Sequence, residues 1–402
     1  MDPRSNGRRR FLRGALLATG GALLTTRLAF AGSGGDARLI VIIMRGAVDG
    51  LAMVPPYADP DYVRLRGSLA IAAPGASDGA LRLDSLFGLH PQLAFLHESF
   101  AAGELTVFHA AATAYRDRSH FDGQDVLESG VPVPHASQTG WLNRALAAQP
   151  HATAGSAERG VALGSNVPLM MRGPAAVASW SPTKLADLDA DTLQRIADLY
   201  AHDPLLGQRL GAAQTADSMA GTDSSGMMGG GNNRYEELIH ATAGFLANEA
   251  GPRVAVFDTT GWDTHANEGG ARGQLGNRFG ALDAALRSLK TQLGATWRNT
   301  AILAVTEFGR TAAVNGTGGS DHGTATAALL LGGAVRGGRV ISDWPGLSAA
   351  TLYQQRDLAP TLDLRAVFKG ALVEHMGVPS SALETVFPDS GSVRPLRDLF
   401  RA

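Results

Sequence analysis

Acidic residues and histidines gather in two short segments, each of which directly follows a stretch that reads as a buried strand. The first segment contains Asp263 and His265, and the second contains Glu307, Asp321 and His322. Open α/β sheets build their sites where the carboxyl ends of parallel strands meet. Carboxylates and imidazoles are ligands that suit a divalent metal ion. The two segments therefore predict a metal site at one edge of a sheet.

Each of these residues also has a simpler interpretation. Asp263 and His265 are two positions apart, so in an extended segment both side chains point to the same side; an aspartate, however, also commonly caps a helix. Glu307 ends a very apolar strand, where a carboxylate is costly unless it is paired, and Arg310 is the nearest partner. The later aspartate and histidine could brace a turn. Their joint occurrence favours a single metal site.

A further carboxylate, Asp49, follows the apolar run 38–44 in the same way and is another candidate ligand. Arg45 stands at the same strand exit. Arg45 or Arg310 could hold the oxyanion of a substrate, because a guanidinium group matches the geometry of such anions.

Ser119 lies where a helix is predicted to begin. With Asp122 three residues later it is almost a capping box, which explains both residues as a helix start. A hydroxyl group at a helix N-terminus is also where a nucleophile attacking phosphate or sulfate would lie, because free backbone N–H groups there hold anions. His120 has three possible roles: a ligand, a general acid or a packed side chain.

Alternating strands and helices position these residues. Runs rich in branched apolar residues predict strands over 38–44, 104–111, 253–257, 300–305 and 327–331. Helical spacing predicts helices over 91–102, from 119, over 270–293 and over 363–376. This alternation predicts an α/β fold with a doubly wound, mostly parallel sheet flanked by helices.

The region 180–250 interrupts this alternation. It begins with a polar helical stretch, and 211–233 is rich in glycine, serine and methionine, which favours a loop. Two interpretations of this helical and glycine-rich insertion stay open: an addition at the edge of the sheet, or a cap over the site.

The first 31 residues have the layout of an export signal. Arg8, Arg9 and Arg10 precede Phe11 and an apolar stretch that is too short to span a bilayer, and Ala29–Ala31 supplies the small residues that a signal peptidase reads. The segment resembles a twin-arginine signal. It predicts the export machinery of that pathway as a partner, a periplasmic or secreted mature protein without a stable membrane span, and one α/β domain over 32–402. The alternative is a cytosolic protein with a basic first helix.

Composition excludes several classes of protein. The chain has no cysteine, so disulfides, thiolate nucleophiles and cysteine-bound metals are excluded. The formal net charge is −2 and no long basic stripe follows the signal, which argues against nucleic acid as a partner. A small or polymer-borne substrate fits better.

With these residues in hand, the chain resembles the family catalogued as domain of unknown function 1501 (DUF1501), whose members look like distant relatives of alkaline phosphatases and sulfatases. The resemblance implies an alkaline-phosphatase-like domain. It also implies Asp49 as the first metal ligand, Ser119 as the nucleophile, Asp263 and His265 as a middle pair of ligands and His322 as the last histidine. The matching segments are Arg45–Gly50, Leu89–Pro91, Arg118–Asp122, Gly140–Trp141, Gly261–His265, Thr306–Thr311, Asp321–Gly323 and Leu331–Gly333.

The chain departs from that pattern at Phe308, which stands where a histidine ligand is expected beside Glu307. A second alignment places Asp321 and His322 on the later Asp-His pair instead and leaves His375 as the only histidine after it. The resemblance therefore implies one or two ions of zinc, magnesium, calcium or manganese.

These observations predict an exported metal-dependent hydrolase of phosphate or sulfate esters, in which Ser119 attacks the ester. The first alternative is a non-catalytic exported binding protein that keeps the fold. The second is a metal-free serine hydrolase, although no Gly-x-Ser-x-Gly motif occurs.

Overall fold

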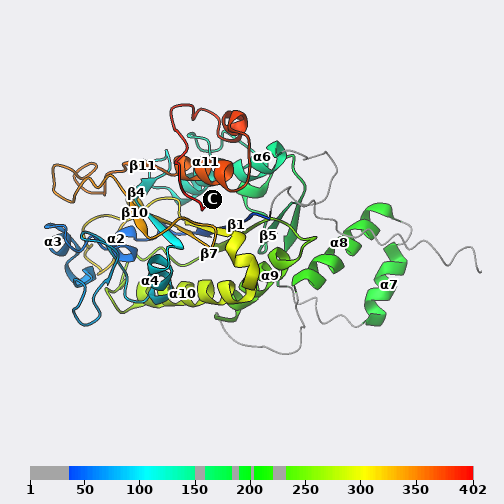
Figure 1. The fold of residues 1–402 in the computed structure, drawn as a ribbon, viewed down its shortest axis with the longest axis horizontal. Helices are drawn as coiled ribbons and strands as arrows, with labels where there is room; N and C mark the ends of the chain where they lie inside the picture. The colour runs from blue at the N-terminus through cyan, green and yellow to red at the C-terminus, as the bar shows by residue number, and fades with distance from the viewer. Residues whose placement is uncertain (1–35, 150–158, 183–189, 201–202, 221–231, 402) are drawn as a thin grey trace, which may run out of the picture. The chain divides into compact units, whose positions relative to one another are not determined.

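The apolar run 38–44 forms the middle of a nine-stranded sheet in the computed structural model (Figure 1). The residues that the structure describes are 36–149, 159–182, 190–200, 203–220 and 232–401. Strand β1 (Arg38–Met44) is buried along its whole length, as a strand covered on both faces must be. It pairs in parallel with β7 (Val254–Thr259) on one side and with β8 (Thr300–Val305) on the other.

The strands lie in the order β10, β4, β9, β8, β1, β7, β5, β6, and β11 pairs with β4. Their remaining bounds are β4 (Leu105–Ala112), β5 (Gly160–Leu163), β6 (Val177–Trp180), β9 (Thr326–Leu331), β10 (Arg339–Ile341) and β11 (Leu362–Asp363). A separate small sheet consists of β2 (Leu81–Arg82) and β3 (Gly88–Leu89). The prediction of a mostly parallel α/β sheet is confirmed.

Strand β9 is the exception, because it runs antiparallel to both of its neighbours, β4 and β8. A parallel neighbour needs a crossover connection, usually a helix. The chain between β8 and β9 contains no helix, so it returns directly. This return leaves a long loop at the carboxyl end of β8, and the second acid-histidine segment lies in that loop.

Helices cover both faces of the sheet. Their bounds are α2 (Gly50–Met53), α3 (Tyr62–Arg66), α4 (Ala94–Ala101), α5 (His120–Ser129), α6 (Trp141–Ala148), α7 (Ala190–Tyr200), α8 (Pro204–Ala220), α9 (Asn232–Ala247), α10 (Gln274–Leu293), α11 (Leu364–Glu374) and α12 (Leu383–Val386). Short 3-10 turns are η1 (Gly67–Leu69), η2 (Leu169–Met171), η4 (Gly294–Asn299) and η5 (Ser380–Ala382). Helices α4, α9 and α10 lie on one side of the sheet and α6 and α11 on the other (Figure 1).

Alternate side chains of β1 point to opposite layers, as the two-residue period of a strand requires. Leu39, Val41 and Ile43 belong to the same core as Trp141 of α6 and Phe368 of α11. The rings of Trp141 and Phe368 stack with centroids 4.8 Å apart. This packing holds β1 rigidly, and with it the strand exit beside the site.

The described residues fall into two compact units, of which the smaller contains α7 and most of α8. Helix α9 belongs to the larger unit and packs on α10 and β7. The prediction of a loop over 211–233 is wrong for the residues at its two ends that the structure describes. Helix α8 continues to residue 220, and helix α9 begins at residue 232. Residues 221–231 lie outside the described part of the chain, and the choice between edge insertion and cap stays a prediction.

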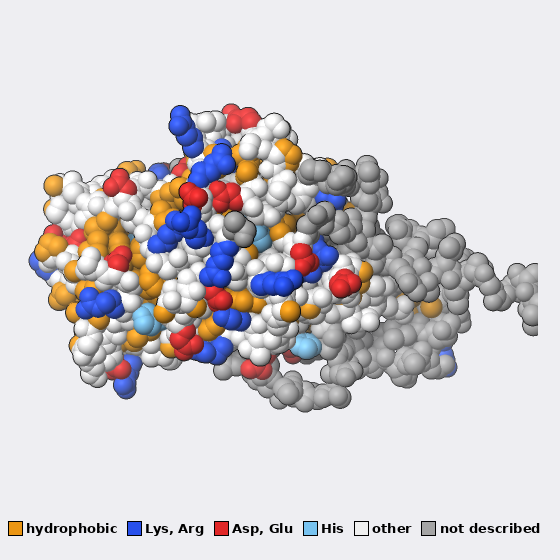
Figure 2. All heavy atoms as spheres, in the orientation of Figure 1, with side chains coloured by type: hydrophobic (Ala, Val, Ile, Leu, Met, Phe, Trp, Pro, Cys, Tyr) orange, Lys and Arg blue, Asp and Glu red, His pale blue; other side chains and the backbone are white. Residues whose placement is uncertain are grey.

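The proposed export signal, residues 1–31, also lies outside the described residues and stays a prediction. None of the described helices combines the length and the apolarity needed to cross a membrane. On the face shown in Figure 2, acidic and basic side chains of the described residues are interspersed.

Buried His109 of β4 makes the stability of the fold depend on pH. Its ring packs against Phe87 and Trp344, and its Nε2 donates to the carbonyl oxygen of Val54 at 2.9 Å. Burial lowers the pKa of His109 from 6.5 to about 4. The unfolded chain therefore binds a proton more readily between these two pH values, so stability is fully present above pH 6.5 and is lost as the pH falls to about 4.

We expect this group alone to contribute about 3 kcal/mol to that loss. Replacing His109 with glutamine should flatten the pH dependence of the unfolding free energy between pH 6.5 and 4, measured by urea denaturation at several pH values. An unchanged slope in the variant would contradict the assignment.

Candidate metal centre

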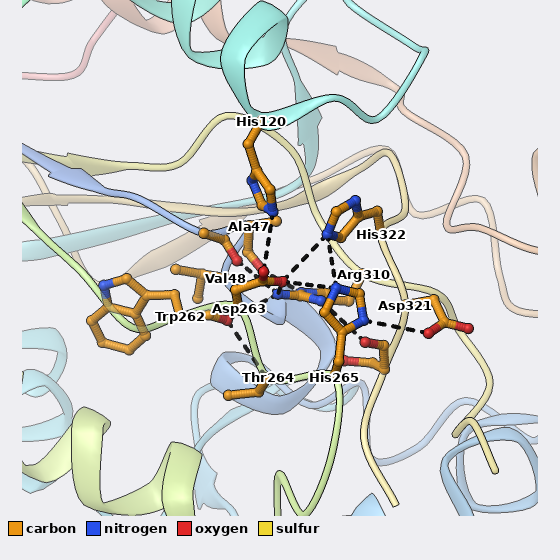
Figure 3. Close-up of polar contacts among 12 residues, drawn as sticks. Ala47, Val48, His120, Trp262, Asp263, Thr264, His265, Arg310, Asp321 and His322 are labelled. Carbon is orange, nitrogen blue, oxygen red and sulfur yellow. Dashed lines mark hydrogen bonds and ion pairs between the residues drawn. The ribbon is translucent and has the colours of Figure 1, made fainter. Parts of the chain in front are cut away.

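Three adjacent parallel strands bring the candidate residues to one edge of the sheet. The loop after β7 carries Asp263 and His265, and the loop after β8 carries Asp321 and His322. Helix α5 begins with His120 at the same place (Figure 3). Because β1 lies between β7 and β8 and runs parallel to both, their exits meet at its carboxyl end.

His120, Asp263 and His322 offer ligand atoms that all lie within 4.8 Å of one another. They form the one group of three or more metal-ligating side chains that converges in this way among the described residues. His120 Nε2 lies 3.5 Å from Asp263 Oδ2, and His322 Nε2 lies 3.3 Å from Asp263 Oδ1. The three side chains come from different segments, so the cluster is a product of the tertiary fold.

His265 completes the rim of this cluster. Its Nε2 lies 3.0 Å from Nε2 of His322 and 3.0 Å from Oδ1 of Asp263. Its Nδ1 lies 3.5 Å from Oδ1 of Asp321, which therefore stands behind His265 (Figure 3). The predicted ligands His265 and Asp321 are thus brought close to the cluster, His265 at its edge and Asp321 one step further out.

His120 is oriented by Glu307. Its Nδ1 bonds to Oε1 of Glu307 at 2.8 Å, and this hydrogen bond raises the pKa of His120. Nε2 then faces the cluster, where it is buried and has no hydrogen-bond partner within the described chain. A metal-binding histidine commonly donates its other ring N–H group to a carboxylate in this way.

Glu307 lies behind His120, outside the cluster. Its carboxylate is fully buried and accepts hydrogen bonds from Gly46 N at 2.9 Å, Gln124 Nε2 at 3.1 Å and Thr306 Oγ1 at 2.9 Å, besides that of His120. Burial raises the pKa of Glu307, but these hydrogen bonds outweigh it and keep the pKa below the usual value. The structure therefore gives this predicted ligand a supporting position.

His322 is oriented by the backbone of Arg118. Its Nδ1 donates to the carbonyl oxygen of Arg118 at 3.0 Å, which leaves Nε2 unprotonated and facing Asp263. Burial lowers the pKa of His322, so the ring is neutral near pH 7. Arg118 has a φ of 62°, and its side chain bonds to the buried carboxylate of Asp357 at 2.7 Å. Strained backbone of this kind is characteristic of functional sites.

Asp263 is held by Arg310, whose side chain is fully buried. Arg310 donates to the carbonyl oxygens of Ala47 at 2.7 Å, Gly46 at 2.8 Å, Ser320 at 3.1 Å and Trp262 at 3.2 Å, and to Asp263 Oδ1 at 2.5 Å. Burial raises the pKa of Asp263, but Arg310 and the histidines outweigh it and keep the carboxylate ionised. All three guanidinium nitrogens of Arg310 are used within the protein, and no ion pair with Glu307 forms.

Two other predicted residues lie away from the cluster. Asp49 is fully buried as the N-cap of α2, where it accepts from Ala52 N and pairs with Arg66. Arg45 pairs with Asp258 at 2.6 Å and with Glu128 at 2.7 Å. Both side chains are engaged by partners in the protein, and neither belongs to the converging group of His120, Asp263 and His322.

Ser119 is the N-cap residue of α5 and is half-buried beside His120 in the chain. Its side chain makes no capping hydrogen bond, and its backbone N–H group donates to the phenol oxygen of Tyr115 at 3.2 Å. Asp122 accepts from Tyr115 at 3.1 Å and from His135 at 2.9 Å. The expected reciprocal capping box is therefore replaced by a network around Asp122.

Phe308 fills the space where the family resemblance implies a histidine. Its buried ring stacks on His120 with centroids 5.0 Å apart and lies 5.4 Å from His322. Gly123 of α5 makes this approach possible, because a Cβ atom there would lie 2.9 Å from the Phe308 ring. Phe308 thus packs beneath two of the three converging side chains and contributes no ligand atom.

The residues that orient the cluster carried little signal in the sequence. Arg118, Gln124 and Asp357 are ordinary polar residues in their local context, and their roles follow from contacts across 79 to 239 positions of the chain. Arg118 alone offered a hint, because it directly precedes the predicted helix start. The other two depend on tertiary contacts that no spacing rule reveals.

Comparison of the chain with known protein families finds a match to one family. Residues 109–387 match the family described as "Protein of unknown function (DUF1501)". No curated protein sequence matches the chain. Similar solved structures include the C-terminal periplasmic domain of EcEptC from Escherichia coli in complex with zinc, at 12% identity and a TM-score of 0.37 over 75% of this chain and 74% of that one. Another is the phosphonate monoester hydrolase of Agrobacterium radiobacter, at 10% identity and a TM-score of 0.33 over 76% and 70%.

Proposed function

The chain belongs to the DUF1501 family, and we propose, from the convergence of His120, Asp263 and His322 with Ser119 at the N-terminus of α5, that it is a metal-dependent hydrolase of phosphate or sulfate esters. The convergence of these three ligand atoms is the observation that carries the proposal. The supporting contacts behind each ligand, made by Glu307 and Arg310 among others, are those that a built metal site requires.

The donor set fits a transition metal such as zinc. Two imidazole nitrogens and a carboxylate oxygen suit zinc, whereas magnesium and calcium prefer oxygen ligands. Two zinc–nitrogen bonds at a tetrahedral angle hold their nitrogens about 3.3 Å apart. The distances between ligand atoms in the cluster lie on either side of that value: 3.0 Å between Nε2 of His265 and Nε2 of His322, 3.3 Å between Nε2 of His322 and Oδ1 of Asp263, and 3.5 Å between Nε2 of His120 and Oδ2 of Asp263. The Nε2 atom of His120, which makes no hydrogen bond and lies 3.5 Å from Asp263 Oδ2, is the atom that a metal ion would satisfy.

The bound metal would polarise the ester and lower the pKa of the attacking hydroxyl group. The protein itself supplies orientation: Glu307 holds His120, Arg118 holds His322, and Arg310 holds Asp263. The side chain of Asp263 is 42% exposed, so a substrate reaches the cluster from solvent.

Chelation tests the proposal directly. The purified protein should contain about one zinc ion per chain by elemental analysis and should hydrolyse p-nitrophenyl phosphate or p-nitrophenyl sulfate. Chelation should abolish hydrolysis, and added zinc should restore it. Absence of bound metal together with absence of hydrolysis after zinc addition would overturn the proposal, whereas bound metal without any turnover would favour a non-catalytic binding protein.

We propose Ser119 as the nucleophile, since it lies at the N-terminus of α5 directly before the proposed ligand His120, and its hydroxyl group bonds to the Asp122 side chain instead of capping the helix. Ser119→Ala should lower hydrolysis by roughly a thousandfold or more and leave the zinc content unchanged. Ser288→Ala on the exposed side of α10 is the matched control and should retain full activity. Unchanged turnover in Ser119→Ala would assign the attack to water instead.

A further inference from the structure

A buried acid, Glu268, joins the two loops that carry the candidate ligands. Its Oε2 accepts a hydrogen bond from Thr264 Oγ1 at 3.0 Å and another from Ser320 Oγ at 2.5 Å. Thr264 stands between Asp263 and His265, and Ser320 lies two residues before His322. The carboxyl group of Glu268 therefore bonds to both loops, in each case to a residue no more than two positions from one of the converging side chains.

The backbones of the two loops are joined at the same place. Glu268 N donates to Gly318 O at 3.0 Å, Asn267 N to Thr317 O at 3.1 Å, and Ser320 N to Thr264 O at 3.2 Å. The Glu268 side chain lies at the centre of this contact and is fully buried. A shift of its carboxyl group would thus move one loop against the other.

Two further buried groups hold Glu268 in place. Arg66 pairs with Asp49 and lies 3.5 Å from Oε1 of Glu268, and none of the three side chains is more than 1% exposed. Two carboxylates thus share one guanidinium group. Burial and the charge of Asp49 raise the pKa of Glu268 to about 8, so near neutral pH Glu268 is mostly protonated and can donate to Asp49.

We infer that Glu268 is a positioning residue of the metal centre, whose carboxyl group sets the separation between the loop of Asp263 and His265 and the loop of His322. The inference rests on the metal site proposed above. Asp263 and His322, with ligand atoms 3.3 Å apart, come one from each loop. Metal–ligand bonds tolerate displacements of only a few tenths of an ångström, so the spacing of the loops sets the affinity.

Two substitutions at Glu268 distinguish the effect of its hydrogen bonds to Thr264 and Ser320 from the effect of its ionisable carboxyl group. Glutamine keeps an oxygen that accepts from Thr264 and Ser320, and its amide group can donate to Asp49 as the protonated acid does. Alanine removes both functions. We expect Glu268→Gln to bind zinc within about threefold of the wild type and Glu268→Ala to bind it roughly 10–100-fold more weakly. Competition with a chromophoric chelator measures the affinity, on the full chain.

Asp283 provides the matched control. It is also a buried carboxylate with a pKa raised by burial, but it accepts from the backbone N–H groups of Phe95 and Leu96 at the start of α4. Asp283→Ala should lower the melting temperature without changing the zinc affinity. If Glu268→Ala does not fold, Thr264→Val, which removes one of the two donors to Glu268, should weaken zinc binding several-fold.

Wild-type zinc affinity in Glu268→Ala, or in Thr264→Val where the alanine variant does not fold, would overturn the inference and leave the metal site standing. Equally weak binding by the glutamine and alanine variants would also overturn it, because the hydrogen bonds would then not matter. A wild-type protein that binds no zinc would overturn the proposed function and this inference together.

Discussion

Replacing His322 with alanine is expected to release the bound metal and to lower ester hydrolysis by roughly a thousandfold. His322 is one of the three converging side chains of the proposed metal site, and Arg118 fixes its ring so that Nε2 faces Asp263. Phe308 beside it offers only carbon atoms, so the nearest replacement is His265, whose Nε2 lies 3.0 Å from that of His322 and would have to move to bind in its place. Elemental analysis and hydrolysis of p-nitrophenyl esters measure the two losses.

His135 offers a control of the same residue type. Its side chain is 64% exposed and bonds to Asp122 and Asp125 on the surface of the protein. His135→Ala should keep both the metal content and the activity of the wild type. Full activity in His322→Ala would rule out the three-ligand site, and equal losses in both variants would point to misfolding instead.

Strand-end chemistry pointed to Asp263, His265 and His322 of the proposed site, and the predicted helix start pointed to His120. Asp263, His265 and His322 follow apolar runs that are long and rich in branched residues, so both the strands and their exits could be placed. Which exit residues face one another could not be derived. Glu307 follows a strand as directly as any of them, yet it turns beneath His120 to accept hydrogen bonds.

Asp49 shows why the position of a residue after a predicted strand was not enough to predict whether it joins the cluster. It stands at the end of β1, where a ligand was expected, but Arg66 lies close enough to pair with it. That pairing depends on how α3 packs, and no local pattern in the sequence encodes it. A buried carboxylate needs a cation or several donors, and here the protein supplies its own cation.

The limits of the fold prediction have similar causes. The five strands predicted from apolar runs are all present, whereas the strands of only two to four residues were missed, namely β2, β3, β5, β6, β10 and β11. Segments so short have no measurable period. In the large sheet, β5 pairs with the predicted β7, β10 and β11 pair with the predicted β4, and the edge strand β6 pairs with β5.

Replacing Arg310 with methionine is expected to lower the free energy of unfolding by about 3–5 kcal/mol. The buried guanidinium group binds the strand exit at Gly46 and Ala47, the loop at Trp262 and Asp263, and the loop at Ser320. Methionine fills similar space but removes the donor to the carbonyl oxygens of Gly46, Ala47 and Ser320, at a cost of about 1–3 kcal/mol for each that water does not reach. The carbonyl oxygen of Trp262 still accepts from Thr264 N at 3.0 Å. Urea denaturation measures the loss.

Lysine at position 310 separates the charge from the geometry of the guanidinium group. A single ammonium group cannot reach all three segments that Arg310 joins, so Arg310→Lys should recover only part of the stability. Arg336→Met, which removes an exposed arginine paired with Asp398 at 3.4 Å, should cost less than about 1 kcal/mol. If Arg310→Met costs no more than this control, water must satisfy the carbonyl oxygens, and Arg310 does not hold the three segments together.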